Sequence, residues 1–366
     1  MAFWAELGEK PVSGVFGLKA LGIDFPFMIA PMVGLSHVAF RELVRSYTPV
    51  GVNALRFTEM LSTRKLPSER LHLTRELRVA PNERHFIPQL LGNEERFIEP
   101  SVRKMMELSP WGFDINMGCP QTHVLRHNWG VRLMGDPEYA ADVVRMVKRH
   151  ARVPVSVKLR GGADKDIDES YLMNFTSALE DAGVDWITIH ARPRAAKHEG
   201  PANWGVVGKI ASARKIPVVA NGDIQTSDDA VKVVREFGCA GAMIARAATV
   251  RPWILWQIAE DLGMTSTPAG REGERAPRTP EDEAREFYRA FLSLIDLVEC
   301  YFGEGDGKEE YGLQKLRFYA ATASRWFMFG HSFWKVTMKA KDFQAMREGV
   351  ADYAGRTSGV MMSRVE

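Results

Sequence analysis

Eight short apolar segments recur along residues 27–245, and their regular alternation with helical patterns constrains the fold more than any other feature. The segments are rich in Val, Ile and Phe and lie at 27–31, 53–57, 86–91, 112–116, 154–160, 185–190, 216–221 and 241–245. Their length and composition are typical of buried strands. Between them, residues 39–47, 138–150, 169–183 and 228–238 place apolar side chains at helical spacing. Strands that alternate with helices in this way form parallel sheets.

Eight such units predict the α/β fold class and, within it, a (β/α)8 TIM barrel. The main alternative is a doubly wound open sheet. That alternative is disfavoured because no G-x-G-x-x-G follows the first segment and no G-x-x-x-x-G-K-[ST] occurs in the chain. Any cofactor therefore has to bind by other means.

The end of the chain has a different character. Residues 263–282 are rich in Gly, Pro, Thr and charged side chains, as linkers are. Beyond them only helical patterns occur, for example over 283–302 and 313–329. We predict a barrel domain over 1–262, a linker over 263–282, and a smaller all-helical C-terminal domain over 283–366.

Composition excludes several classes of protein. The three cysteines are far apart in sequence, which argues against a disulfide framework and against a cysteine zinc site. The first residues lack the pattern of a signal peptide, and no apolar run approaches the ~18 residues of a membrane-spanning helix. We expect a cytoplasmic monomer that binds neither metal nor membrane. The formal net charge of +2 permits a polyanionic partner only through a local basic patch.

Polar residues follow or close nearly every predicted strand. The active site of a TIM barrel lies at the carboxyl ends of its strands, so these side chains are expected to converge. They are Pro31 and Met32, Gln89, Asn116 and Cys119, Lys158 and Arg160, His190 and Arg192, Asn221, Gly222 and Asp223, and Ala245 and Arg246. So many polar groups at one mouth favour a polar or anionic ligand, because unpaired buried polar groups are costly.

The residue types indicate a flavin mononucleotide. The turn after the seventh strand and Arg246 after the eighth suit a phosphate, which loops in these positions often bind in this fold. Lys158 and His190 would lie beside a ring, where a cation stabilises a reduced flavin. Gln89 offers the donor and acceptor that a flavin pyrimidine edge requires. Cys119 is mostly a thiol at neutral pH and could act as a general acid.

Each residue also has a structural interpretation. Lys158 could reach solvent from a strand end, His190 could be a satisfied core histidine, and Cys119 could be a small buried hydrophobe. The stretch 121–130, which follows Cys119, is either a mobile loop that closes over a substrate or an ordinary surface loop.

At this point the motifs resemble those of the tRNA-dihydrouridine synthase family. The resemblance spans roughly residues 20–262. It is carried by "APMVGLSHVAFR" 30–41, "PQLLG" 88–92, "DINMGCP" 114–120, "VSVKLRGG" 155–162, "TIHARPR" 188–194, "VVANGDI" 218–224 and "GAMIARAA" 241–248. Their order and spacing together are specific, whereas any one of them alone is weak.

The resemblance implies an FMN enzyme that uses NADPH to reduce specific uridines in tRNA to 5,6-dihydrouridine. Hydride would pass from flavin N5 to C6 of the base, and Cys119 would protonate C5. FMN would be held by Pro31, Met32, Gln89, Lys158, His190, Asn221, Gly222, Asp223, Ala245 and Arg246. Asn116, Arg160 and Arg192 would contact the substrate. Ala245 stands where the family usually has Gly, and its Cβ would restrict the backbone there.

The tail carries the expected RNA contacts. Residues 312–366 have nine Lys and Arg against four Asp and Glu, interleaved with Phe318, Tyr319, Trp326, Phe327 and Trp334. Such charge suits phosphates, although the aromatic residues could simply form the core of a helical bundle. The rival functions are an FMN barrel enzyme for a free pyrimidine, a Schiff-base aldolase using Lys158, and a non-catalytic RNA-binding relic. The sequence does not specify which uridine is reduced.

Overall fold

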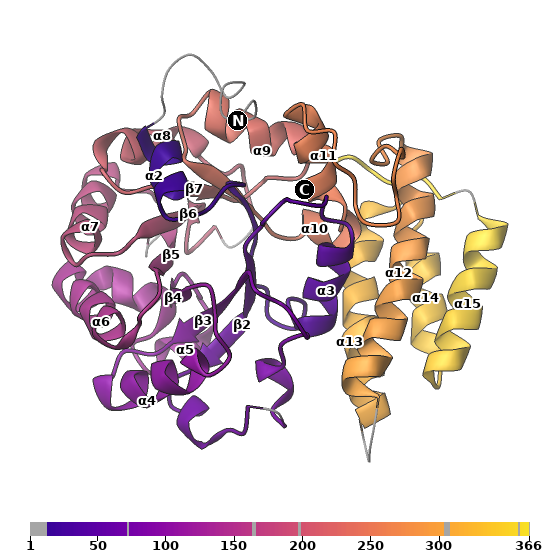
Figure 1. The fold of residues 1–366 in the computed structure, drawn as a ribbon, viewed down its shortest axis with the longest axis horizontal. Coiled ribbons are helices and arrows are strands. Elements are labelled where there is room, and N and C mark those ends of the chain that lie inside the picture. Colours follow the sequence, from indigo (N-terminus) through magenta and orange to yellow (C-terminus); the bar gives the residue numbers. More distant parts are fainter. Residues whose placement is uncertain are drawn as a thin grey trace. The chain divides into compact units, whose positions relative to one another are not determined.

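The computed structural model describes residues 13–71, 73–162, 166–196, 199–303, 308–357 and 359–365. Eight parallel strands close into a barrel in the order β1 to β8 (Figure 1). The strands are β1 Phe27–Ile29, β2 Arg56–Ser62, β3 Phe86–Leu91, β4 Phe113–Met117, β5 Val155–Gly162, β6 Trp186–Pro193, β7 Val218–Asn221 and β8 Gly241–Ile244. The predicted TIM barrel is confirmed.

Several strands run further than expected, and β2 and β6 show the largest extensions. We placed the second strand at 53–57, whereas β2 begins at Arg56 and ends at Ser62, so Thr58 and Glu59 lie within it. Likewise β6 continues past His190 to Pro193 and includes Arg192. Both extensions contain charged residues, which is why apolar runs alone did not reveal them. These two strands therefore extend further at their carboxyl ends than the sequence indicated.

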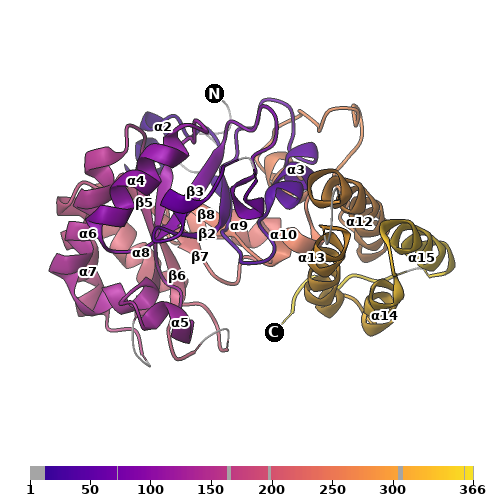
Figure 2. The ribbon, with the colours of Figure 1, turned by 90° about the horizontal axis from the view of Figure 1, so that it is seen from below.

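Helices surround the barrel strands (Figures 1 and 2). Those of the first compact unit are α2 Ser13–Ala20, α4 Glu95–Met106, α5 Thr122–Leu125, α6 Pro137–His150, α7 Glu169–Asp181, α8 Trp204–Ala213 and most of α9 Ser227–Arg235. Side-chain oxygens of Asp136, Asp168 and Asn203 cap α6, α7 and α8. We did not predict α4, which contains Pro100, nor α8, which contains two glycines, because both residue types disfavour helices.

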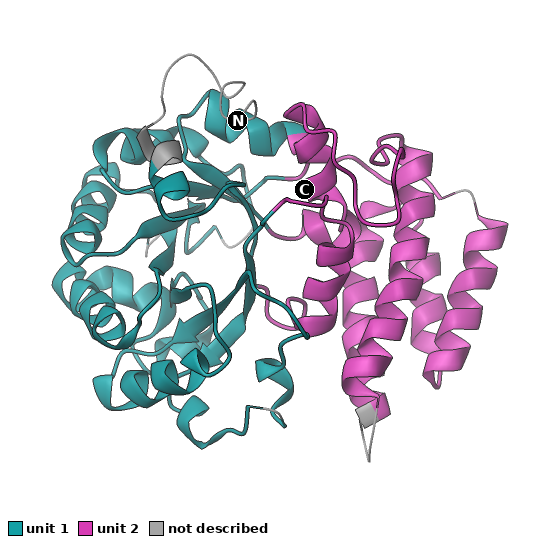
Figure 3. Cartoon of the chain, in the orientation of Figure 1, with its two compact units in different colours: residues 1–31, 53–224, 228–244 teal, residues 32–52, 225–227, 245–366 magenta. Residues whose placement is uncertain are grey.

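The chain divides into two compact units that interleave in sequence (Figure 3). The first contains residues 1–31, 53–224 and 228–244, and the second contains 32–52, 225–227 and 245–366. The predicted boundaries at 262 and 283 were drawn along the sequence and did not anticipate this interleaving. As domain assignments they stay predictions.

The second unit is helical in its described part. It comprises α3 Val38–Ser46, α10 Ala247–Val250, α11 Ile254–Asp261, α12 Pro280–Phe302, α13 Lys308–Ala323, α14 His331–Lys339 and α15 Phe343–Arg356. The long α12 packs against α3, α13 and α15. Its Phe287 and Phe291 form aromatic contacts with Phe333 of α14, and Phe291 also contacts Tyr319 of α13. No helix in the described ranges is both long and apolar enough to cross a membrane.

Candidate active site

The strand register brings predicted residues from four neighbouring strands of the barrel together on one face. Asn116 on β4 pairs with Lys158 on β5, and Arg160 on β5 pairs with His190 on β6. His190 in turn pairs with Asn221 on β7. Register partners in a parallel sheet direct their side chains to the same face, as do residues two apart on one strand. Lys158, Arg160 and His190 therefore share a face with Asn116 and Asn221.

Gln89 belongs to a buried hydrogen-bond network that the sequence analysis missed. Its Nε2 donates to Asp114 Oδ2 at 2.7 Å, and its Oε1 accepts from Asn116 Nδ2 at 2.8 Å. The other oxygen of Asp114 accepts from Ser156 Oγ at 2.6 Å. Asp114 fixes the orientation of the Gln89 amide, which keeps one donor and one acceptor for a ligand. A charged residue in the middle of an apolar strand is a signal that could have identified Asp114.

The electrostatics of this network couple Asp114 to Lys158. Burial raises the pKa of the Asp114 carboxyl, opposed by hydrogen bonds from Gln89 and Ser156 and by the charge of Lys158. Burial lowers the pKa of the Lys158 ammonium, and Asp114 opposes this shift. Each group makes it easier for the other to stay ionised. Lys158 is thus a partly exposed but largely desolvated cation, which Asp114 helps to keep charged.

Cys119 follows β4 in a turn held by its neighbours. Asn116 Oδ1 accepts from the backbone nitrogens of Gly118 and Cys119, at 3.1 and 2.9 Å. Arg160 Nε donates to the Gly118 carbonyl at 3.0 Å. Burial raises the pKa of the Cys119 thiol, and a hydrogen bond from the Gln121 backbone and the charges of Arg160 and Lys158 only partly offset this rise. The thiol therefore stays protonated at neutral pH, as a proton donor requires.

The turn after β7 is braced from β6. Arg192 is 4% exposed, and its Nη2 donates to Asp223 Oδ1 at 2.5 Å and to the Gly200 carbonyl at 2.6 Å. The second Asp223 oxygen accepts from the Ala202 backbone nitrogen at 2.7 Å. Asp223 has a φ of 54°, so this pairing also holds a strained backbone. Arg192, predicted to contact substrate, is here a partner of the turn.

Asn221 and Gly222 complete this turn. Asn221 Nδ2 donates to the Met243 carbonyl at 2.7 Å and so ties β7 to β8. Gly222 has a φ of 99°, and a Cβ on it would lie 2.7 Å from His190 Cδ2. The glycine is required both by its backbone conformation and by the close approach of the His190 ring.

The remaining predicted residues lie outside these contacts. Pro31 follows β1 in the first unit, while Met32, Ala245 and Arg246 belong to the second. In the second unit, the Met32 carbonyl accepts a hydrogen bond from Ser36 Oγ at 3.1 Å. Arg246 directly precedes α10. Ala245 is not among the positive-φ residues, so the backbone at this position does not need glycine. The Ala245 Cβ therefore does not strain the backbone, and it could affect FMN only by occupying space near the phosphate.

A parallel barrel with a desolvated lysine, a histidine and a protonated thiol near its strand ends defines the chain as a TIM-barrel enzyme. Residues 28–284 match the profile of the dihydrouridine synthase (Dus) family. The chain belongs to that family, which confirms both the predicted resemblance and the prediction of an enzyme.

Curated relatives agree with this assignment. A probable tRNA-dihydrouridine synthase of Rhodobacter capsulatus is 32% identical, over 76% of this chain and 83% of that protein. The tRNA-dihydrouridine synthase B of Pseudomonas aeruginosa is 30% identical, over 76% and 79%. The probable tRNA-dihydrouridine synthase 1 of Synechocystis is 33% identical over 63% of each chain, so this match spans less than two thirds of that relative.

Proposed function

We propose that this chain reduces specific uridines in tRNA to 5,6-dihydrouridine, with FMN as cofactor and NADPH as reductant. Family membership and the names of the relatives support the reaction. The observation that carries it furthest in this chain is Cys119, a thiol kept protonated in a turn that Asn116 and Arg160 hold. A monomer in the cytoplasm is part of the same proposal.

The barrel residues fit a flavin mononucleotide. Gly222 lets the His190 ring lie directly against the turn after β7, so that the ring and the backbone groups of the turn can face one ligand. Arg192 neutralises the Asp223 carboxylate, so backbone groups of the turn can face an anion without repulsion. Gln89 keeps a free donor and acceptor capacity, and Lys158 supplies the cation. The residues of the first unit that would hold FMN are Pro31, Gln89, Lys158, His190, Asn221, Gly222 and Asp223. The FMN contacts expected from the sequence for Met32, Ala245 and Arg246 stay predictions.

The chemistry that bound FMN would supply is hydride for C6 of the uracil ring. Cys119 then provides the proton at C5, and the raised pKa of its thiol keeps that proton available. Asn116 already uses both acceptor positions of Oδ1 and one N–H of Nδ2. One N–H remains for the base. The main role of Asn116 is therefore to hold the Cys119 turn, and its remaining N–H can contact the base.

The RNA contacts proposed for the second unit concentrate at 325–341. Arg325, Lys335, Lys339 and Lys341 are exposed, and within the described residues none of them forms an ion pair. No acidic residue interrupts this stretch. By contrast, Arg317, Arg347 and Arg356 each pair with a carboxylate. Exposed cations that form no ion pair favour phosphate binding.

The aromatic residues of this tail divide between the two expected roles. Tyr319, Trp326 and Phe327 are buried, so for them the bundle-core interpretation is right. Phe318 and Trp334 are 49% and 38% exposed. Trp334 lies among the unpaired cations of 325–341, where an exposed ring suits contact with the bases of RNA, whereas Phe318 lies outside that stretch and follows the paired Arg317.

Mapping dihydrouridine in RNA from cells without this protein tests the proposal. Loss of dihydrouridine at defined tRNA positions would support the proposal, and an unchanged distribution of dihydrouridine would contradict it. In vitro, Cys119→Ala is expected to leave flavin reduction intact and to slow uridine reduction by ~10²–10⁴-fold. A wild-type rate would refute the role of Cys119. A colourless purified protein would favour the aldolase, and turnover of free uracil or dihydroorotate without tRNA would favour the free-pyrimidine enzyme.

A further inference from the structure

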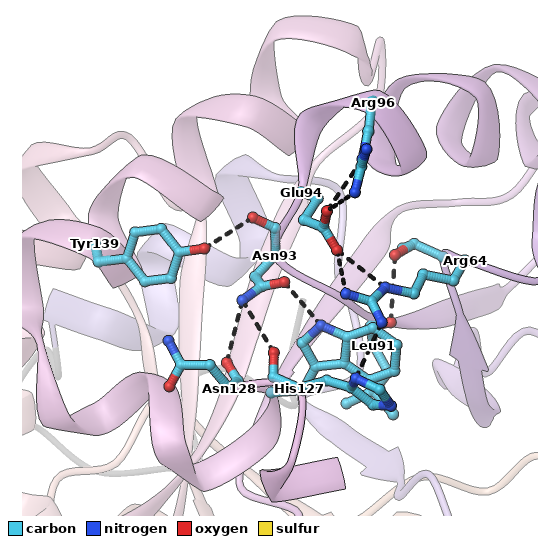
Figure 4. Close-up of polar contacts among 10 residues, drawn as sticks. Arg64, Leu91, Asn93, Glu94, Arg96, His127, Asn128 and Tyr139 are labelled. Atoms are coloured by element: carbon cyan, nitrogen blue, oxygen red, sulfur yellow. Dashed lines mark hydrogen bonds and ion pairs between the residues drawn. The ribbon is translucent and has the colours of Figure 1, made fainter.

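A buried asparagine outside the predicted site ties down the segment that follows Cys119. Asn93 lies two residues beyond β3 and is 6% exposed. Its Nδ2 donates to the carbonyls of His127 and Asn128, both at 3.3 Å. Its Oδ1 accepts from the indole Nε1 of Trp129 at 2.8 Å (Figure 4). One amide therefore binds three consecutive residues of the segment.

Trp129 connects this amide to Cys119. Its side chain is 6% exposed and packs with Leu91 and Val124, and Cys119 packs against the same cluster. The backbone nitrogen of Val131 donates to the Cys119 carbonyl at 3.1 Å. The segment after Cys119 is not irregular throughout, because it contains the short helix α5 and ends in this buried contact.

Gly130 makes the connection tight. It has a φ of 62°, and a Cβ on it would lie 2.5 Å from the Cys119 carbonyl oxygen. Asn128 also has a positive φ, of 57°. The backbone around Trp129 is thus bent sharply on both sides and has little freedom to shift without moving Cys119.

A second layer holds Asn93 and Trp129 from outside (Figure 4). The Arg64 guanidinium lies over the Trp129 ring at 5.1 Å and its Nη1 is 3.0 Å from His127 Nδ1. Glu94 accepts two hydrogen bonds from Arg64, at 2.9 and 2.5 Å. Tyr139 Oη donates to the Asn93 carbonyl at 3.2 Å. Contacts from α6 and from the segment after β2 thus hold Asn93 and Trp129 in place.

We propose that Asn93 and Trp129 are positioning residues for Cys119, an inference that rests on the proposed function. The backbone of Cys119 is held at its nitrogen by Asn116 and at its carbonyl by Val131. The first of these contacts comes from the strand, and the second depends on the Asn93–Trp129 hydrogen bond. Breaking that bond loosens the carbonyl side of the Cys119 backbone, so the thiol proton is delivered from a less defined position.

Trp129→Phe is the sharpest test, because it removes the Nε1 donor and keeps most of the packing. We expect single-turnover uridine reduction to fall by ~10-fold or more, since small displacements of reacting groups slow reactions by up to ~10². Reduction of the flavin by NADPH and the KM for tRNA should stay unchanged. Asn93→Asp keeps the acceptor but sets a buried carboxylate oxygen against the His127 and Asn128 carbonyls, so it should give a larger decrease of the same kind. Trp111→Phe, just before β4, is the matched control.

Alkylation of Cys119 by iodoacetamide gives a reading that needs neither substrate nor cofactor. It is measured in a Cys300→Ser background, because Cys300 is exposed whereas Cys239 is buried. Trp129→Phe should change the alkylation rate and its pH profile, and Trp111→Phe should not. If the wild type fails to reduce uridine, the proposed function is wrong, yet alkylation still tests the positioning. Unchanged alkylation and unchanged turnover in folded Trp129→Phe would overturn the inference, as would an effect on the KM for tRNA alone.

Discussion

Single residues at the barrel rim combine conformational and chemical requirements. Gly222 is the clearest case, because its positive φ excludes most side chains and its missing Cβ admits the His190 ring. Asn116 is a second case, because one short amide orders the Cys119 turn and also binds Gln89. Sequence motifs identified both residues, but their partners became visible only in the structure.

Replacing Gly222 with alanine should therefore have two effects. Alanine disfavours the positive φ of this position, which should lower the free energy of unfolding by about 1–2 kcal/mol. The clash with His190 should in addition reduce the flavin content of the purified protein, measured by absorbance. Gly183→Ala is the matched control, since Gly183 has a φ of 87° and nothing within 4 Å of its would-be Cβ. Equal flavin content in the two variants would contradict the role of Gly222.

The raised pKa of Cys119 predicts a pH dependence. A general acid is lost as the pH rises through its pKa, and burial moves this pKa above the ordinary value of 9.0. Uridine reduction limited by proton transfer should therefore stay constant through neutral pH and decline only above pH 9. Single-turnover rates across pH would show this. Cys119→Ser should be slower at every pH without that decline, and a decline beginning near pH 7 would contradict the prediction.

At the scale of elements, several of the described helices begin at a capping side chain. The long α12 starts after Thr279, whose Oγ1 accepts from the Asp282 backbone nitrogen at 3.1 Å. Pro280 occupies the first turn together with three acidic residues, Glu281, Asp282 and Glu283. Proline and negative charge both favour a helix N-terminus. This is why α12 begins at Pro280, slightly before the predicted start at 283.

Thr279→Ala should destabilise the second unit through loss of this cap. The expected decrease in the free energy of unfolding is about 1 kcal/mol, within the range of roughly 0.5–2 kcal/mol for such caps. Chemical denaturation followed by circular dichroism would measure it. Thr279→Ser retains the hydroxyl and should stay near wild type. A similar loss in both variants would mean that the threonine methyl group, not the cap, stabilises the helix.

At the scale of the whole molecule, paired and unpaired cations lie in different parts of the chain. Most described arginines contact carboxylates, whereas the cations of 325–341 do not. The small net charge of the chain therefore says little about RNA binding, because the local distribution decides it.

Lys335→Ala and Lys339→Ala should weaken tRNA binding and reduce its dependence on salt. Each phosphate contact that is lost should lower the slope of log K against log salt by about 1. Titration of tRNA by fluorescence anisotropy at several salt concentrations would measure both. Arg356→Ala is the control, because Arg356 pairs with Asp352 in the wild type. Equal effects from Arg356 and the two lysines would contradict this assignment.

The sequence by itself determined the eight strands, the barrel, the family and the residues at the strand ends. These follow from local patterns: strand length, helical spacing and short motifs depend on residues close together in the chain. The tertiary structure alone decided that Asp114 orients Gln89, that Arg192 braces Asp223, and that Asn93 holds Trp129 beside Cys119. These pairs are separated by 25, 31 and 36 residues, and side-chain partners so distant are set by strand register and packing, which no local pattern encodes.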